Sequence, residues 1–121
     1  MSNNNKIGWR FDNTYSKLPS SMLAKLPPTP VKDPELVILN HSLSKMLELD
    51  FTKLSNKNLA SIFSGNLLPE GSDAIAQAYA GHQFGHFTLL GDGRAIVVGE
   101  HLSKNNKRFD IQFKGSGKTP Y

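Results

Sequence analysis

The pattern of hydrophobic and polar residues changes its period close to residue 90. Before this point, apolar residues recur every three or four positions, as they do on one face of an α-helix. After it, apolar and polar residues alternate, as they do along a strand with one buried face. The pattern predicts an α+β protein with about three helices followed by an antiparallel β-hairpin.

The first predicted helix runs over residues 34–49. Asp33 is a suitable N-cap, and Pro34 fits the first helical position, where its missing N–H costs nothing. Apolar residues then follow at helical spacing, namely Leu36, Leu39, Leu43, Met46 and Leu47. This stripe predicts a helix that packs one face against the core.

Two further helices are predicted after the first. Ser55 or Asn56 can cap a shorter helix, and Gly65 is placed to end it. The third helix begins at Ser72 or Asp73 and includes the alanine-rich run 74–80. Alanine has the highest intrinsic helix propensity, so this run favours a helix.

Residues 1–33 are predicted to form an extended N-terminal arm. Prolines interrupt this segment at four positions, namely Pro19, Pro27, Pro28 and Pro30. Each proline fixes φ and moves the preceding residue away from the helical region, which excludes a long helix. Large apolar residues such as Trp9, Phe11 and Leu23 indicate that the arm packs on the outside of a domain formed by residues 34–121.

Two strands are predicted near the end of the chain. Residues 96–98 are β-branched, and Phe109, Ile111 and Phe113 alternate with polar residues. Residues 103–107 join the two runs, and their two asparagines tolerate the left-handed backbone of a hairpin turn. The alternation places Lys114 on the face opposite to the core aromatics.

The composition is that of a single small domain. The chain has 121 residues, of which 38% are hydrophobic and none is cysteine. Without cysteine, disulfides and thiolate metal sites are excluded. The polar start of the chain is followed by no apolar signal region. No apolar run is as long as a membrane span, which needs about 18 residues. We therefore expect a cytoplasmic protein without a membrane partner.

The positive charge is concentrated in the last quarter of the chain. The net charge is +4, and residues 91–121 carry six lysines and arginines against three acidic residues. Residues 1–90 carry eight against seven. This distribution favours an anionic partner for the C-terminal stretch, either a nucleotide or a nucleic-acid backbone.

The stretch from residue 91 to residue 118 suggests a phosphate-binding cradle. Gly91 and Gly93 allow backbone N–H groups to approach an oxygen-rich ligand, and Arg94 adds a fixed fork of donors. Lys114 lies one hairpin away, as the phosphate-pairing lysine does in protein kinases. A turn without ligand and a solvated lysine on an edge strand are the alternatives.

A true P-loop is rejected. The run Gly115-Ser116-Gly117-Lys118-Thr119 resembles the end of such a loop. The pattern requires a glycine at position 112, which is Gln112, and a following helix, which Pro120 prevents.

A helical zinc pair is also disfavoured. His82 and His86 have the spacing of such a pair, but the position of the general base holds Gln83. Flanking glycines weaken the helix, and no third ligand lies nearby. We therefore interpret both histidines as structural, and Asp92 and Asp110 as a turn residue and a strand-surface charge.

Short motifs along nearly the whole chain carry a family resemblance. They are Phe11-Asp12-Asn13-Thr14-Tyr15, Leu18-Pro19, Pro28-Thr29-Pro30-Val31, Leu39-Asn40, Gly65-Asn66, Leu68-Pro69, Ala78-Tyr79-Ala80-Gly81-His82-Gln83-Phe84-Gly85-His86-Phe87, Leu90-Gly91-Asp92-Gly93-Arg94-Ala95, Lys114-Gly115, Gly117 and Thr119-Pro120-Tyr121. Together these residues resemble the selenoprotein O (SelO) family of kinase-like proteins.

The resemblance implies a protein adenylyltransferase that moves AMP from ATP to Ser, Thr or Tyr of protein substrates. It implies that Gly91, Gly93 and Arg94 contact ATP and that Lys114 contacts its phosphates. The fold implied is a partial kinase-like N-terminal lobe. In the family, the catalytic base and the Mg²⁺ ligands lie beyond the stretch that this chain resembles. We therefore expect an N-terminal part that is inactive alone and lacks its C-terminal catalytic lobe.

Two other functions are weighed. The first is a small basic module that binds nucleic acid through residues 94–118. It is disfavoured because the aromatics of this stretch, Phe109 and Phe113, are assigned to the core and cannot stack on bases. We therefore expect no nucleic-acid partner. The second alternative is a truncated remnant without function, which would expose a hairpin edge and apolar surface.

Overall fold

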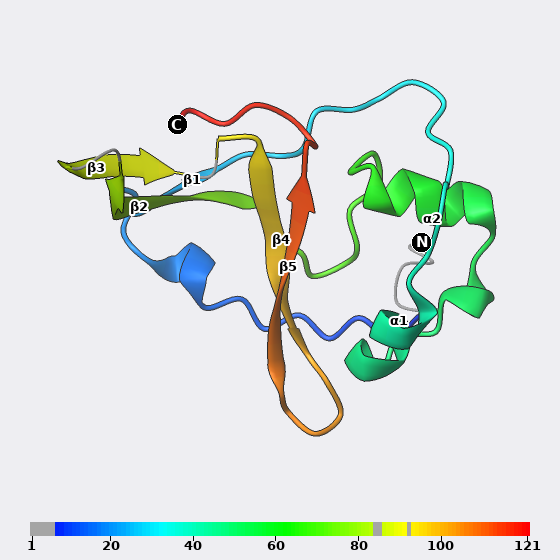
Figure 1. Cartoon of the computed structure of the whole chain (residues 1–121). Helices are drawn as coiled ribbons and strands as arrows, with labels where there is room; N and C mark the ends of the chain where they lie inside the picture. Colours follow the sequence, from blue (N-terminus) through cyan, green and yellow to red (C-terminus); the bar gives the residue numbers. More distant parts are fainter. Residues whose placement is uncertain (1–6, 84–85, 92) are drawn as a thin grey trace.

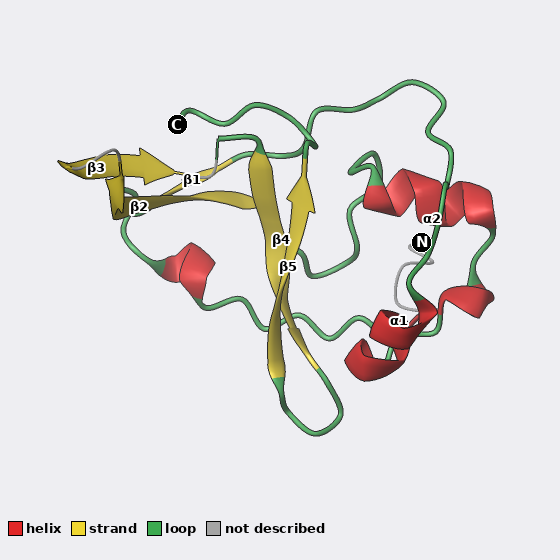
Figure 2. Ribbon diagram, viewed as in Figure 1, coloured by secondary structure: helices red, strands yellow, loops and turns green. Residues whose placement is uncertain are grey.

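The structure is a computed structural model that describes residues 7–83, 86–91 and 93–121, and it combines one antiparallel sheet with two short α-helices (Figures 1 and 2). The helices are α1 (His41–Leu47) and α2 (Asn56–Phe63). The strands are β1 (Leu23–Lys25), β2 (Ile75–Gln83), β3 (His86–Gly91), β4 (Ala95–Leu102) and β5 (Arg108–Lys114). Short 3-10 turns occur at Tyr15–Lys17 and Phe51–Lys53. The α+β class predicted from the sequence is confirmed.

The sheet is ordered β1-β2-β4-β5, and β3 pairs with the outer half of β2. All of these pairs are antiparallel. The first residues of β2 lie between two neighbours, because Ile75 is paired with Lys25 of β1 and with Val97 of β4. The rest of β2 extends away with β3, while β4 and β5 form a long twisted hairpin (Figure 1).

The two helices lie on the same side of the β4–β5 hairpin (Figure 2). Ile96, Val98 and Phe113 form the buried core on that face, and Phe63 of α2 packs edge-on against Phe113 with ring centroids 6.2 Å apart. A second cluster joins the start of the chain to the end of α1 through Trp9, Leu47 and Leu49, among others. Burial of these side chains supplies the main driving force for folding.

The predicted β-hairpin is confirmed. β4 and β5 pair antiparallel, and residues 103–107 connect them, as the sequence indicated. Asn106 has φ of 59°, the left-handed conformation that asparagine tolerates better than most residues. The alternation is also correct, because Phe113 is buried whereas Lys114 is exposed.

The second predicted helix is likewise confirmed as α2. Ser55 is its N-cap, and the Ser55 hydroxyl accepts a hydrogen bond from the Asn58 N–H at 3.2 Å. Gly65 follows the helix with φ of 90°, a conformation that glycine adopts without steric cost.

The third predicted helix is wrong, because residues 75–80 of its alanine-rich run lie in strand β2. Helix propensity is a weak preference that tertiary context overrides. Ile75 and Ala76 are buried between β1 and β4, where small and β-branched side chains fit between neighbouring strands. Within the described residues there are two α-helices, not three.

The first predicted helix is shorter than expected. α1 begins at His41, not at residue 34, and its N-cap is Asn40, whose side chain accepts from the Leu43 N–H at 2.9 Å. Asp33 has φ of 48°, which is incompatible with the extended backbone of an N-cap. Residues 34–40 are therefore irregular, and Val37 and Ile38 are 93% and 84% exposed.

The two histidines considered as a zinc pair lie on strands and not on a helix. His82 is in β2, opposite Phe87, and His86 opens β3, opposite Gln83. Phe84, Gly85 and Asp92, which belong to motifs discussed above, lie outside the described residues. No helix in the described part of the chain is long and apolar enough to cross a membrane.

Candidate functional site

One end of the β4–β5 hairpin brings the predicted glycine turn next to the predicted lysine. Ala95 and Lys114 are direct partners in the ladder. Beyond them, the Gly115 N–H donates to the Arg94 carbonyl at 2.8 Å, and the Thr119 N–H donates to the Gly93 carbonyl at 2.9 Å. Gly91 ends β3, opposite Ala78 of β2. The backbone therefore holds three of the predicted residues, Gly93, Arg94 and Lys114, close together.

Two glycines at this end have open space where a side chain would lie. Gly93 has φ of 53° and Gly115 has φ of 82°, and a Cβ at either position would meet no atom within 4 Å. Gly117 differs, because a Cβ there would lie 2.5 Å from the Thr29 hydroxyl oxygen. The Thr29 N–H donates to the Ser116 carbonyl at 2.7 Å, so the arm closes that part of the segment. The open space lies over Gly93 and Gly115.

Three cationic residues lie in the chain segments at this end of the sheet. Arg94, Lys114 and Lys118 are exposed, and none of them forms an ion pair within the described residues. By contrast, Arg108 and Lys25 are paired with carboxylates. Exposed cations and free backbone N–H groups are features that bind a phosphate group.

The described residues do not fit a metal ion. They contain no group of three or more histidine or acidic side chains that could hold one. Mg²⁺ is usually bound by one or two carboxylates together with substrate phosphates. Among the described residues, no carboxylate takes part in the strand pairing and turn hydrogen bonds at this end of the sheet.

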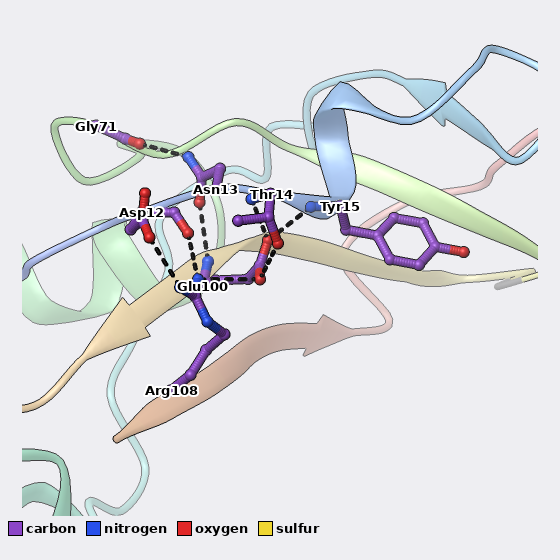
Figure 3. Close-up of polar contacts among 7 residues, drawn as sticks. All are labelled: Asp12, Asn13, Thr14, Tyr15, Gly71, Glu100 and Arg108. Carbon is purple, nitrogen blue, oxygen red and sulfur yellow. Dashed lines mark hydrogen bonds and ion pairs between the residues drawn. The ribbon is translucent and has the colours of Figure 1, made fainter. Parts of the chain in front are cut away.

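A second polar site lies at the opposite end of the hairpin, and sequence reasoning did not find it. The Glu100 carboxylate is only 7% exposed. It accepts hydrogen bonds from the Thr14 hydroxyl at 2.7 Å, the Thr14 N–H at 2.5 Å and the Tyr15 N–H at 2.8 Å (Figure 3). This carboxylate joins the N-terminal arm to strand β4.

Arg108 and Asn13 extend this network on either side of Glu100. The Arg108 guanidinium lies 3.2 Å from Glu100 Oε1 and 2.8 Å from Asp12 Oδ2 (Figure 3). The Asn13 side chain accepts from the Glu100 N–H at 2.9 Å and donates to the Gly71 carbonyl at 2.8 Å. The sequence feature that belongs to this network is the polar run 12–14 between two aromatic residues. Local periodicity does not connect this run to residue 100.

The network stabilises the charged form of its carboxyl groups. Burial disfavours the ionised Glu100, but the hydrogen bonds from Tyr15 and Thr14, together with the charge of Arg108, outweigh it and hold the pKa below its ordinary value. The pKa of Asp12 is also lowered, mainly by its hydrogen bond from Arg108. These donors occupy the acceptor oxygens of Glu100, so this carboxylate anchors the arm to β4.

Comparison with known proteins identifies the class of protein. The family described as Protein adenylyltransferase SelO matches residues 6–121. The match covers nearly the whole chain, and the chain belongs to this family.

Individual relatives are bacterial proteins named Protein nucleotidyltransferase YdiU. The one from Pelagibacter ubique strain HTCC1062 is 64% identical over 115 residues, which are 95% of this chain and 24% of the relative. The one from Nitrosococcus oceani is 62% identical over 115 residues, and the one from Bacillus thuringiensis strain Al Hakam is 56% identical over 121 residues. The chain spans about a quarter of the length of these relatives.

Proposed function

We propose that the end of the sheet carrying Gly91, Gly93, Arg94 and Lys114 binds the phosphates of ATP. In this proposal, the chain is the ATP-binding N-terminal part of a protein adenylyltransferase, which transfers AMP to Ser, Thr or Tyr of protein substrates. The sheet and α2 would then be part of a kinase-like lobe, with ATP reversed relative to ordinary kinases.

The observation that carries the proposal is the pairing of the glycine turn with the lysine-bearing strand end. Ala95 is the ladder partner of Lys114, and the Arg94 carbonyl accepts from Gly115. The open space over Gly93 and Gly115 leaves room for an anion beside exposed cations. Membership of a family described as adenylyltransferases supports ATP as that anion.

The proposal assigns binding, and not catalysis, to these residues. Nucleotidyl transfer depends on positioned metal ions as well as on a phosphate cradle. The described residues offer no cluster that fits Mg²⁺, so the metal-dependent steps lie outside their role. We expect the 121-residue chain to bind ATP weakly and to transfer no AMP. A catalytic lobe would have to supply the catalytic base and the metal ligands.

Calorimetric titration of the purified chain with ATP tests the proposal. Lys114→Ala and Arg94→Ala should each weaken ATP binding by about tenfold, because each removes a charge-assisted contact worth about 1.4 kcal/mol. Lys57→Ala removes an exposed lysine of α2 and is the matched control. Unchanged affinity in the first two variants would show that ATP does not bind at this end of the sheet.

The same variants separate the nucleic-acid alternative. A basic module would bind RNA or DNA in a salt-dependent manner through the exposed hairpin turn, which carries Lys104 and Lys107. Loss of nucleic-acid binding on changing these two lysines, with no effect of Lys114→Ala, would favour that alternative. We expect neither binding nor such an effect.

A further inference from the structure

A short proline-rich part of the arm crosses the chain close to the point where it leaves β5 (Figure 1). Residues 27–31 have the sequence Pro-Pro-Thr-Pro-Val, and we call them the proline strap. Proline fixes φ and favours an extended, semi-rigid backbone. Because proline has no N–H group, Thr29 supplies the only backbone donor of residues 27–30. It donates this hydrogen bond to the Ser116 carbonyl at 2.7 Å.

The proline strap covers the middle of the segment that follows β5. Ser116 and Gly117 are buried, whereas Gly115 and Lys118 on either side of them are exposed. A side chain would not fit at Gly117, because a Cβ there would lie 2.5 Å from the Thr29 hydroxyl oxygen and 2.9 Å from the Thr29 backbone nitrogen. The strap and this segment are therefore in direct backbone contact.

The proline strap also rests against the turn that follows α2. Pro28 is the buried residue of the strap, and a Cβ at Gly65 would lie 2.5 Å from Pro28 Cβ. Next to Gly65, the Asn66 side chain accepts from the Val31 N–H at 2.7 Å and donates to the Val31 carbonyl at 2.7 Å. Asn66 thus clamps the end of the strap to α2 by two hydrogen bonds.

The start of the proline strap is anchored separately. Leu26, the residue before the strap, packs against the buried core of β4 and β5, and its N–H donates to the Ala74 carbonyl at 3.2 Å. The strap is therefore fixed at one end by Leu26 and at the other by Val31. A semi-rigid chain that is fixed at both ends holds Thr29, between them, in one place.

The segment that the strap covers is also hydrogen-bonded to the glycine turn of the proposed ATP site. The N–H groups of Gly115 and Thr119 donate to the carbonyls of residues 94 and 93. The segment is thus held by the glycine turn near its two ends and by the strap in its middle. Without the strap, the bonds to the turn would have to order a segment with two glycines, the most flexible residues, by themselves.

We propose that Thr29 and Asn66 are positioning residues for the phosphate cradle. Thr29 holds residues 115–119 against the glycine turn, and Asn66 acts through the strap that carries Thr29. The consequence for ATP rests on the proposed function, whereas the hold on residues 115–119 does not. Donors that are already in place bind a phosphate more tightly, because they do not have to be ordered on binding.

Residue-specific hydrogen exchange of the 121-residue chain, followed by NMR without ATP, tests the hold. Asn66→Ala removes the clamp at an exposed position. The Gly115 and Thr119 amides should then lose most of their protection and exchange about tenfold faster. The Asp12 and Leu102 amides, which take part in hydrogen bonds between the arm and β4, should change by less than about twofold. Equal acceleration of all four amides, or no acceleration, would overturn the proposal.

Gly65→Ala tests the strap from its other side. The added methyl group would collide with Pro28 and displace the strap, so the Gly115 and Thr119 amides should again exchange selectively faster. Gly71→Ala is the matched control, because φ is 86° at Gly71 and 90° at Gly65, but the nearest foreign atom at Gly71 lies at an ordinary 3.5 Å. The same exchange pattern in both variants would show that strain, and not the strap, is the cause.

Calorimetric titration with ATP tests the consequence for the cradle. Asn66→Ala should weaken ATP binding by about threefold, because a segment that is docked for only part of the time lowers the apparent affinity in proportion. Asn58→Ala, at an exposed asparagine of α2, is the matched control and should bind ATP as the parent chain does.

The outcomes distinguish this proposal from the proposed function. Selective exchange at residues 115 and 119 with unchanged ATP affinity in Asn66→Ala, although Lys114→Ala weakens binding, would overturn the positioning role. Unchanged ATP affinity in Lys114→Ala would instead contradict the proposed function. In that case, selective exchange in Asn66→Ala would still support the hold of the strap on the segment.

Discussion

Glu100 accepts two hydrogen bonds from Thr14, one from its hydroxyl and one from its backbone N–H, at 2.7 and 2.5 Å. The two residues are 86 positions apart in the chain. Because Glu100 lies on β4 and Thr14 lies on the arm, their contact fixes the arm against the hairpin that carries Lys114. The arm is thus a structural part of the sheet and not a tail beside it.

Glu100→Gln should destabilise the protein by about 1–3 kcal/mol. The amide cannot reproduce the charge-assisted hydrogen bonds from Thr14 and Tyr15, and it leaves the Arg108 guanidinium with one carboxylate fewer. Urea denaturation followed by circular dichroism measures the change. Glu35→Gln, which neutralises an exposed carboxylate, is the control and should stay within about 0.5 kcal/mol of the parent. A loss of the same size in both variants would contradict the anchoring role.

Stability should fall as the solution becomes acidic, and Glu100 should account for part of the fall. Its pKa is lower in the folded state than in the unfolded state. The stabilisation is therefore present in full above the ordinary glutamate pKa of 4.5, and it is lost as the pH falls through the lower pKa of the folded state. Urea midpoints between about pH 6 and pH 3 should drop less steeply for Glu100→Gln than for the parent chain. Parallel curves would show that other carboxyl groups cause the whole effect.

Local signals in the sequence predicted the elements whose ends are determined by neighbouring residues. The Ser55 cap and Gly65 delimit α2, and Asn106 supplies the left-handed turn of the hairpin. The same hairpin explains why Gly93 and Lys114 were expected on one end of the sheet. Their backbone proximity was therefore predictable, whereas their contact with ATP stays a prediction.

Long-range pairing determined the parts that the sequence did not show. The alanines of β2 favour a helix by themselves, but their strand pairs with β1 and β4 at its start and with β3 further along. Similarly, the side chains of residues 12–14 form hydrogen bonds with distant residues, because Gly71 lies 58 positions from Asn13 and Glu100 lies 86 positions from Thr14. Periodicity reports one face of one element and contains no information about which distant element covers it.

Gly99→Ala should destabilise the protein by about 1–3 kcal/mol through overpacking. A Cβ at this position would lie 2.4 Å from the Phe11 ring and 2.9 Å from Asn13 Oδ1. The arm would have to move away from β4, which would also disturb the Asn13 bridge to Gly71. Thermal unfolding measures the loss. In a chain that already carries Phe11→Ala, Gly99→Ala should cost less stability than it does in the parent chain. If the stability losses of the two substitutions simply added, the contact with Phe11 would be excluded as the cause.

Gly93→Ala offers the sharpest test of the phosphate cradle. Its φ of 53° makes alanine strained by about 1–2 kcal/mol, but a Cβ would touch no protein atom within 4 Å. A loss of ATP affinity in this variant would therefore show that the ligand lies close to Gly93, because no neighbouring residue has to move to make room for the methyl group. Gly71→Ala is the matched control, because φ is 86° and its nearest foreign atom, Phe11 Cβ, lies at an ordinary 3.5 Å.

Both glycine variants should lose a similar amount of stability in urea denaturation. Only Gly93→Ala should weaken ATP binding in calorimetric titration, by about tenfold, which corresponds to about 1.4 kcal/mol. The reason is that an added methyl group would occupy the space through which phosphate oxygens approach the backbone N–H groups. Equal ATP affinity in the two variants would place the phosphates away from Gly93, whatever the variants did to stability.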